Sequence, residues 1–181
     1  MVRATSALSI GLVMGFSLCA GQTQPKTDRS LRLMMTESQP GTMSTEQFCI
    51  LVFTDRTFHA EKANRKMGKD RDRRVYGGRV AEVDWNALEP ILDAKEFRDI
   101  KVSRSAPPLM IENSHPYTIS VAREKGFQNM EFLNTDGIKP HERQVKPLLQ
   151  WWKSFRAHMS ESKELPDVRC LPDSNKGIFS Y

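Results

Sequence analysis

The sequence predicts an α+β domain, in which an antiparallel sheet of about four to five strands carries two helices on one face. Three patterns indicate this fold. A continuous apolar run occupies residues 48–53, paired segments with alternating apolar residues occupy 117–133, and two segments at 85–100 and 145–159 space their apolar residues as helices do. The chain has 181 residues, which is enough for one domain of ordinary size.

The composition is that of a globular protein with a mild positive charge. Hydrophobic residues make up 39% of the chain and charged residues 27%, which is far from a disordered composition. The formal net charge of +5 favours encounters with anionic surfaces but does not identify a partner.

Residues 1–21 are predicted to be a signal peptide. Arg3 supplies a positive charge, residues 4–20 carry none, and small residues end the run, so cleavage is expected after Gly21 or after Ala20. The protein is therefore expected to be secreted or periplasmic. The alternative is an N-terminal membrane anchor, because the uncharged run of 17 residues is close to the shortest that spans a bilayer. Lipidation at Cys19 is disfavoured by Leu18, which stands where a small residue is needed.

Residues 22–46 are predicted to be a flexible spacer. They are rich in Gln, Thr, Ser and Pro and show no sustained period, and residues 31–35 are their only apolar cluster. Residues 160–181 contain Pro166 and Pro172 and are predicted to be an extended C-terminal tail. The α+β domain is then expected over residues 47–159.

Removal of the leader leaves two cysteines, Cys49 and Cys170, which an exported chain is expected to join in a disulfide. The bond would tie the first strand to the tail. It would close a loop of about 120 residues, for which the chain-entropy model gives roughly 4–5 kcal/mol before strain. The alternative is two unpaired thiols.

The apolar run Phe48–Phe53 is aromatic and β-branched, which predicts a central strand buried on both faces. Residues 61–79 follow as the most basic part of the chain and contain the turn Gly77-Gly78.

Two interpretations of this basic arm stay open. It is either a solvated hairpin or a surface that contacts phosphate or other anionic groups of a partner. Nucleic acid is disfavoured, because Tyr76 is the one aromatic residue of the arm and export removes the chain from the cytoplasm. The residues predicted to form the anionic-partner surface are Lys62, Arg65, Lys66, Lys69, Arg71, Arg73 and Arg74.

The first helix is expected over Trp85–Ile100. A proline is harmless in the first turn of a helix and disruptive later, so Pro90 suggests a cap at Asn86, or one at Asp84 with a kink.

Residues 109–111 are expected to form a short strand, and residues 117–122 and 127–133 a hairpin around Gly126. For Met130 and Phe132 to share a face with Ile119 and Val121, the loop must contain an even number of residues. Lys125-Gly126 and Arg123 to Gly126 both satisfy this condition. Residues 134–137 then form a turn.

The last helix has the strongest apolar stripe, and its regular part is expected to start near Arg143 or Gln144 because Pro147 must lie early. Trp151 is expected at the edge of the stripe, since it cannot share one face with the tryptophan beside it. The stripe consists of Val145, Leu148, Leu149, Trp152, Phe155 and Met159. Residues 86–92 and 143–149 align around their prolines, which suggests a β-β-α repeat.

No catalytic or cofactor motif is present in the sequence. There is no Gly-x-Ser-x-Gly elbow, no His-Glu-x-x-His, no phosphate-binding glycine loop and no dinucleotide fingerprint. The four histidines are scattered, and two distant cysteines cannot form a Cys-x-x-Cys pair or a zinc knuckle. We therefore expect no cofactor and no metal.

The sequence favours an exported, non-enzymatic binding or envelope-associated protein. Its partner would be anionic or another protein, and it would contact a membrane only through an uncleaved leader. The alternative is a small secreted hydrolase whose active site is built from the loops Asn113–His115 and Asp136–His141.

Overall fold

The structure, a computed structural model, describes residues 29–41, 44–66, 72–102, 115–162 and 169–171. Six strands form one sheet in the order β4-β3-β2-β1-β5-β6, with every neighbouring pair antiparallel. The strands are β1 Leu31–Pro40, β2 Ser44–Phe53, β3 Thr57–Lys66, β4 Asp72–Arg79, β5 Tyr117–Arg123 and β6 Gly126–Phe132. The helices are α1 Glu82–Asp93, α2 Lys95–Arg98, α3 Thr135–Ile138, the 3-10 turn η1 Lys139–His141 and α4 Glu142–Arg156.

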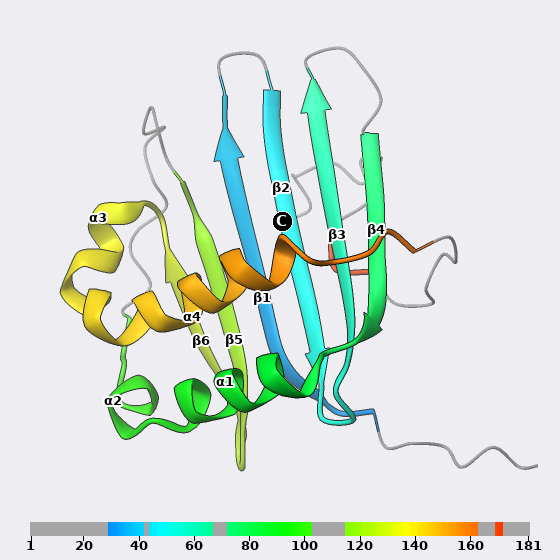
Figure 1. Cartoon of the computed structure of the whole chain (residues 1–181). Coiled ribbons are helices and arrows are strands. Elements are labelled where there is room, and N and C mark those ends of the chain that lie inside the picture. Colours follow the sequence, from blue (N-terminus) through cyan, green and yellow to red (C-terminus); the bar gives the residue numbers. More distant parts are fainter. Residues whose placement is uncertain (1–28, 42–43, 67–71, 103–114, 163–168, 172–181) are drawn as a thin grey trace, which may run out of the picture.

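The predicted α+β class and the antiparallel sheet are confirmed, and Figure 1 shows α1 and α4 crossing one face of the sheet. The expected number of strands was too low, because the sheet has six. Two one-turn helices and η1 also accompany the two long helices. The hairpins β3–β4 and β5–β6 each lead into a long helix, but β1 and β2 precede both units, so the chain is more than a twofold β-β-α arrangement.

The prediction of a flexible spacer is wrong for residues 31–40, which form the central strand β1 between β2 and β5. Leu33 and Met35 are buried on the helix side of the sheet, and Glu37 is buried beside them. The alternation was missed because its third inward residue is a glutamate, which ordinarily points to solvent. The folded part therefore begins before Gln47, while the predicted leader, residues 1–21, lies outside the described residues.

The predicted central strand is confirmed, because all six residues from Phe48 to Phe53 in β2 are buried. Phe48, Ile50 and Val52 belong to the core on the helix side. Cys49 packs on the other side with Ala63 and Leu171. Strand β2 therefore contributes to both faces of the sheet, and each face is covered by a different part of the chain.

The predicted hairpin register is confirmed. Ile119 pairs with Met130 and Tyr117 with Phe132, so the bulky residues of β5 and β6 share the buried face. This is the register of the longer loop alternative, with Arg123 and Gly126 forming the last pair. Gly126 has a φ of +122°, a value that residues with a side chain rarely adopt. The short strand expected at residues 109–111 lies outside the described residues.

Helix α1 begins at Glu82 and not near Asp84 or Asn86, so the expected cap is wrong and Pro90 lies well inside the helix. Pro90 is exposed, and water can bond the backbone carbonyl that lost its N–H partner. The helix ends at Asp93, three residues later, and the N–H of the following Ala94 donates to the Pro90 carbonyl.

Helix α4 buries Val145, Leu148, Trp152 and Phe155 as predicted, but Leu149 is only partly buried. The expectation that Trp151 lies at the edge of the stripe is wrong, because only 6% of it is exposed. Its Nε1–H donates to the Asp84 carbonyl of α1 at 2.9 Å, and its ring stacks on Phe155. The stripe is wide because α4 packs against α1 as well as against the sheet.

Residues 161–162 lie at the edge of β4, and Cys170 and Leu171 pack on the face opposite the helices. Glu161 bridges to Tyr76, and the Ser162 N–H donates to the Val75 carbonyl at 2.7 Å. The predicted disulfide between Cys49 and Cys170 is present, with the two Cα atoms 6.0 Å apart. Within the described parts of the chain, no helix has the length and apolarity to cross a membrane.

Candidate functional site

Two glutamates are buried on opposite faces of the sheet, and the sequence analysis singled out neither as a candidate site. Glu37 in β1 is 5% exposed and Glu61 in β3 is 1% exposed. Each sits at an inward position of its strand: Glu61 lies between the buried His59 and Ala63, and Glu37 follows the buried Leu33 and Met35. A carboxylate at a predicted core position is the signal that would have found them, because such a group must be paired.

Glu37 is held by side chains from four elements or loops of the helix side. Its Oε2 accepts from Trp152 Nε1 at 3.0 Å and from Arg156 at 2.7 Å. Its Oε1 accepts from Gln39 at 2.6 Å and from the Tyr117 hydroxyl at 3.3 Å, and it lies 3.0 Å from His115 Nε2. Burial alone would raise the pKa of Glu37, but these hydrogen bonds and the charge of Arg156 outweigh it and lower the pKa. Glu37 is therefore a fixed negative charge.

Glu37 affects the pKa of its aromatic neighbour Tyr117. Burial, together with the charge of Glu37 and the hydrogen bond to it, raises the pKa of Tyr117 to about 12. The His115 ring stacks on Tyr117 with ring centroids 4.8 Å apart. Tyr117 therefore stays a neutral phenol that donates a hydrogen bond.

A hollow of about 330 Å³ lies beside this cluster, where the end of α4 leaves part of the sheet open. In this hollow, two cations contact the ring of Phe48. Lys62 Nζ lies 4.8 Å from the ring centroid, and the Arg156 guanidinium carbon lies 5.1 Å from it. Lys62 also pairs with Glu46 at 3.1 Å. The residues that line the hollow are Gln39, Glu46, Phe48, Lys62, Tyr76, Arg156 and Met159.

A second hollow of about 200 Å³ lies on the other side of Arg156, between α4 and the β1–β5 part of the sheet. It brings Lys146 and Lys153 of α4 near Glu37 and Tyr117. The larger hollow of about 530 Å³ between α1, α2 and α4 has Arg143 and Glu96 as its charged residues, so it has no excess of either charge. Positive charge therefore gathers in two places. One is the side of α4 that faces β1 and β2, and the other is the start of α4, where Lys139, Arg143 and Lys146 outnumber Glu142 around a hollow of about 570 Å³.

The predicted anionic-partner surface is divided by the geometry of the β3–β4 hairpin. Lys62 and Arg74 pair across the two strands on the helix side, and Arg74 is exposed. Arg73 points to the opposite face, where it bonds Glu61 and the Leu171 carbonyl, so it does not share a face with Lys62 and Arg74. Arg65 and Lys66 pair with Thr45 and Ser44 of β2. Lys69 and Arg71 lie outside the described residues.

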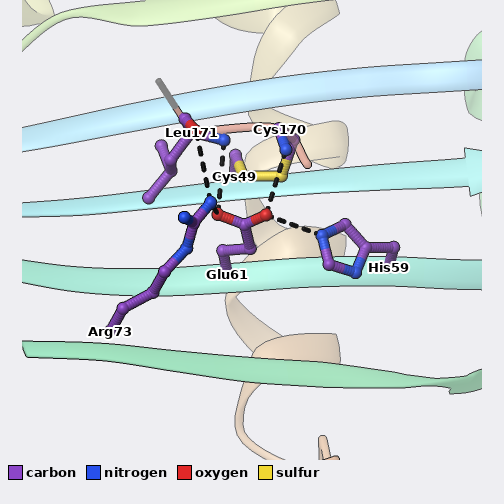
Figure 2. Close-up of a disulfide and its surroundings, with 6 residues drawn as sticks. All are labelled: Cys49, His59, Glu61, Arg73, Cys170 and Leu171. Atoms are coloured by element: carbon purple, nitrogen blue, oxygen red, sulfur yellow. Dashed lines mark hydrogen bonds and ion pairs between the residues drawn. A yellow bond between two sulfur atoms is a disulfide. The ribbon is translucent and has the colours of Figure 1, made fainter. Parts of the chain in front are cut away.

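Glu61 lies under the C-terminal tail, beside the disulfide (Figure 2). Its carboxylate accepts the backbone N–H groups of Cys170 at 3.1 Å and Leu171 at 3.4 Å, bonds Arg73, and lies 2.8 Å from His59 Nε2. Burial opposes ionisation, but the hydrogen bonds from His59, Arg73 and Cys170 outweigh it and lower the pKa of Glu61 to about 2. Glu61 therefore holds the tail on the sheet.

The loops proposed for a hydrolase site do not share partners. His115 contacts Glu37 and Tyr117, whereas Asp136 forms an exposed ion pair with Lys139 at 2.6 Å. His141 lies against Phe132 with ring centroids 6.2 Å apart. Asn113 and Ser114 lie outside the described residues.

No family model matches this sequence, and no curated protein matches it.

Proposed function

We propose that the protein is an exported, non-enzymatic binding protein that holds an anionic group in the hollow beside Phe48. The observation that carries the proposal is the placement of Lys62 and Arg156 on one ring at the wall of that hollow. Arg74 adds a third positive charge, since it pairs with Lys62 across the hairpin and is exposed. A phosphate, sulfate or carboxylate is the kind of group that such a cluster attracts.

The carboxylates nearby position the two cations without using all their hydrogen-bond donors. Arg156 donates to Glu37 through one terminal nitrogen, and a guanidinium has five N–H groups in a planar fork. Lys62 contacts one oxygen of Glu46, and an ammonium has three donors. Because Glu37 and Glu46 already hold the cations, a bound anion needs less ordering of long side chains.

Titration with inorganic phosphate and with sulfate, followed by NMR of labelled protein, tests the binding. We expect shifts at Lys62, Arg74 and Arg156, and a loss of at least about tenfold in affinity in Lys62→Gln/Arg74→Gln, with weaker binding at higher salt. Lys95→Gln/Lys125→Gln is the matched control, because it removes two exposed cations elsewhere. Equal loss in both variants, or binding that salt does not weaken, would refute the proposed site.

Export is supported by the uncharged N-terminal run and by the disulfide, which persists in oxidising compartments. Intact mass of protein recovered from the host envelope or medium, with and without reductant, tests it. A chain starting at Gln22 or Gly21 that gains two hydrogens on reduction is expected. A full-length chain in the membrane fraction would favour the anchor instead, and a full-length chain with free thiols would contradict export.

A second candidate is a hydrolase in which Glu37 orients His115 as a general base, as a carboxylate orients histidine in hydrolytic triads. The His115 side chain is 29% exposed, so solvent reaches it. Tyr117, its other neighbour, is a poor nucleophile because its pKa is about 12. Hydrolysis of activated esters that is lost in His115→Ala and kept in His158→Ala would support this candidate, and equal background rates would exclude it.

A further inference from the structure

The face of the sheet opposite the helices brings together a set of potential metal-ligating atoms, two of which are bonded to each other in the disulfide. The sulfur atoms of Cys49 and Cys170 and a carboxylate oxygen of Glu61 all lie within 4.8 Å of one another. Cys49 and Glu61 pair directly across β2 and β3 and are 0% and 1% exposed. The two sulfur atoms are bonded to each other in the oxidised protein, so reduction must first let them separate. A tetrahedral zinc ion, with thiolate bonds of about 2.3 Å and a carboxylate bond of about 2.0 Å, can then bind all three ligands.

His59 lies next to this cluster, although it is not one of the three residues whose ligand atoms all lie within 4.8 Å of one another. It is 2% exposed, and its Nε2 lies 2.8 Å from Glu61 (Figure 2). Its Nδ1 is buried and has no hydrogen-bond partner among the described residues. Nδ1 lies on the side of the ring away from Glu61 and the disulfide, so Nε2 is the nitrogen that faces the cluster (Figure 2). Imidazole is a common zinc ligand through either nitrogen.

We propose that, when the disulfide is reduced, Cys49, Cys170 and Glu61 bind a zinc ion that keeps the C-terminal tail on the sheet. His59 is the nitrogen ligand at hand for the fourth position. Four hydrogen bonds already reach the Glu61 carboxylate, and the longest, 3.4 Å from the Leu171 nitrogen, is the one that a metal bond replaces at least cost.

The chemistry balances with a thiol reductant. A dithiol gives two electrons and two protons to the Cys49–Cys170 bond, which becomes two thiols while the reductant becomes its own disulfide. Zinc then displaces the two thiol protons and binds the thiolates.

The charge of the buried site is the same in both states. In the oxidised protein, the negative charge of Glu61 is balanced by Arg73. In the zinc form, two thiolates and one carboxylate exceed the charge of the ion by one, and Arg73 balances that remaining charge. Neither state leaves a net charge in the low-dielectric interior, which is the condition under which a buried site is stable.

This inference does not depend on the proposed anion binding, which concerns the opposite face. It gives the tail an attachment in either redox environment: a disulfide where thiols are oxidised, and zinc where they are kept reduced.

Zinc retention by the whole protein tests the inference. Protein that is reduced and freed of metal is mixed with one equivalent of zinc chloride, desalted, and analysed for zinc by mass spectrometry and for helix by circular dichroism. We expect one zinc per chain in the reduced protein and none in the oxidised protein. Cobalt(II) in place of zinc is expected to give a thiolate-to-cobalt charge-transfer band.

Variants separate a built site from loose binding by thiols. Cys49→Ser/Cys170→Ser is expected to retain no zinc, and Glu61→Gln and His59→Gln to bind it at least about tenfold more weakly. Glu37→Gln, which alters a buried glutamate of the other face, is the matched control and is expected to bind as the unaltered protein does.

The outcomes are decisive in each case. Reduced protein that unfolds without zinc and regains its helix with one equivalent supports the inference. Reduced protein that leaves zinc in solution overturns it, whether it stays folded or remains unfolded. Zinc affinity that is unchanged by Glu61→Gln also overturns the proposed ligand set.

Discussion

Glu37 and Glu61 are buried carboxylates of the same kind on the two faces of one sheet, but they serve different purposes. Both are ionised and almost fully buried, and both accept at least four hydrogen bonds. Glu61 accepts two of its bonds from the backbone of the tail, and a disulfide closes the site. Glu37 is bonded by side chains alone, and hollows lie on both sides of its partner Arg156.

This difference separates a carboxylate that holds the tail from one that lies beside the proposed anion site. Backbone donors and a covalent bond leave Glu61 with nothing to offer a soluble ligand while the disulfide is intact. Glu37 instead fixes the long cationic side chain of Arg156, which lines hollows on both sides. The predictions below ask whether the two faces respond as this comparison requires.

The largest effect is expected from removing the covalent closure. Cys49→Ser/Cys170→Ser opens a loop of 121 residues, and the chain-entropy model gives a loss of about 5 kcal/mol in unfolding free energy for a loop of that order. Urea denaturation measures it. A loss below about 1 kcal/mol would mean that Glu61 alone holds the tail. The carboxylate, and not the disulfide, would then account for the difference between the two faces.

The next effect is a dependence of stability on pH that belongs to Glu61. The folded pKa is about 2 against 4.5 for a free carboxyl group, so the unfolded chain takes up the proton first as the pH falls. Ionised Glu61 therefore makes its full contribution to the free energy of unfolding at pH values above the pKa of the unfolded chain. That contribution is lost as the pH falls toward 2.

Glu61→Gln tests that assignment. The variant is expected to lose about 3 kcal/mol at neutral pH, because it leaves His59 and Arg73 without a charged partner, and to show a flatter profile between pH 5 and about pH 2. Denaturant unfolding at a series of pH values measures both quantities. An unchanged slope in the variant would assign the acid sensitivity to other carboxylates.

A smaller stability loss, about 2 kcal/mol, is expected from Glu37→Gln. Its partners Arg156 and His115 have side chains 25% and 29% exposed, so water compensates them in part. The Glu37→Gln variant is also expected to weaken phosphate binding, because Arg156 is released. The Glu61→Gln variant is not expected to weaken it. Titration of both variants measures this contrast, and equal weakening in both would remove the distinction between the two faces.

The sequence was informative where local pattern decides the structure. The continuous run of β2 and the parity of β5 and β6 followed from apolar spacing, because burial of one or both faces sets that spacing. Helix α4 followed from its stripe for the same reason.

The sequence was misleading where a polar residue stands at an inward position. Strand β1 resembled a spacer because Glu37 interrupts its apolar alternation, and the five groups that compensate Glu37 come from parts of the chain up to 119 residues away. The basic arm resembled one surface because charge was counted along the chain, while the pleat sends Arg73 and Arg74 to opposite faces. Long-range pairing of this kind has no local signature.

The smallest effect concerns one hydrogen bond of the Glu37 cluster. Trp152→Phe keeps most of the buried ring but removes the Nε1–H donor that lies 3.0 Å from Glu37. The expected loss is about 1 kcal/mol, because four other donors keep the carboxylate ionised and paired. Trp151→Phe is the matched control, since its donor bonds the Asp84 carbonyl and its loss should leave phosphate affinity unchanged. If Trp152→Phe weakens phosphate binding and Trp151→Phe does not, the position of Glu37 determines the position of Arg156. Equal phosphate affinity in the two variants would mean that Arg156 is held well enough by Glu37 and the Phe48 ring without the indole.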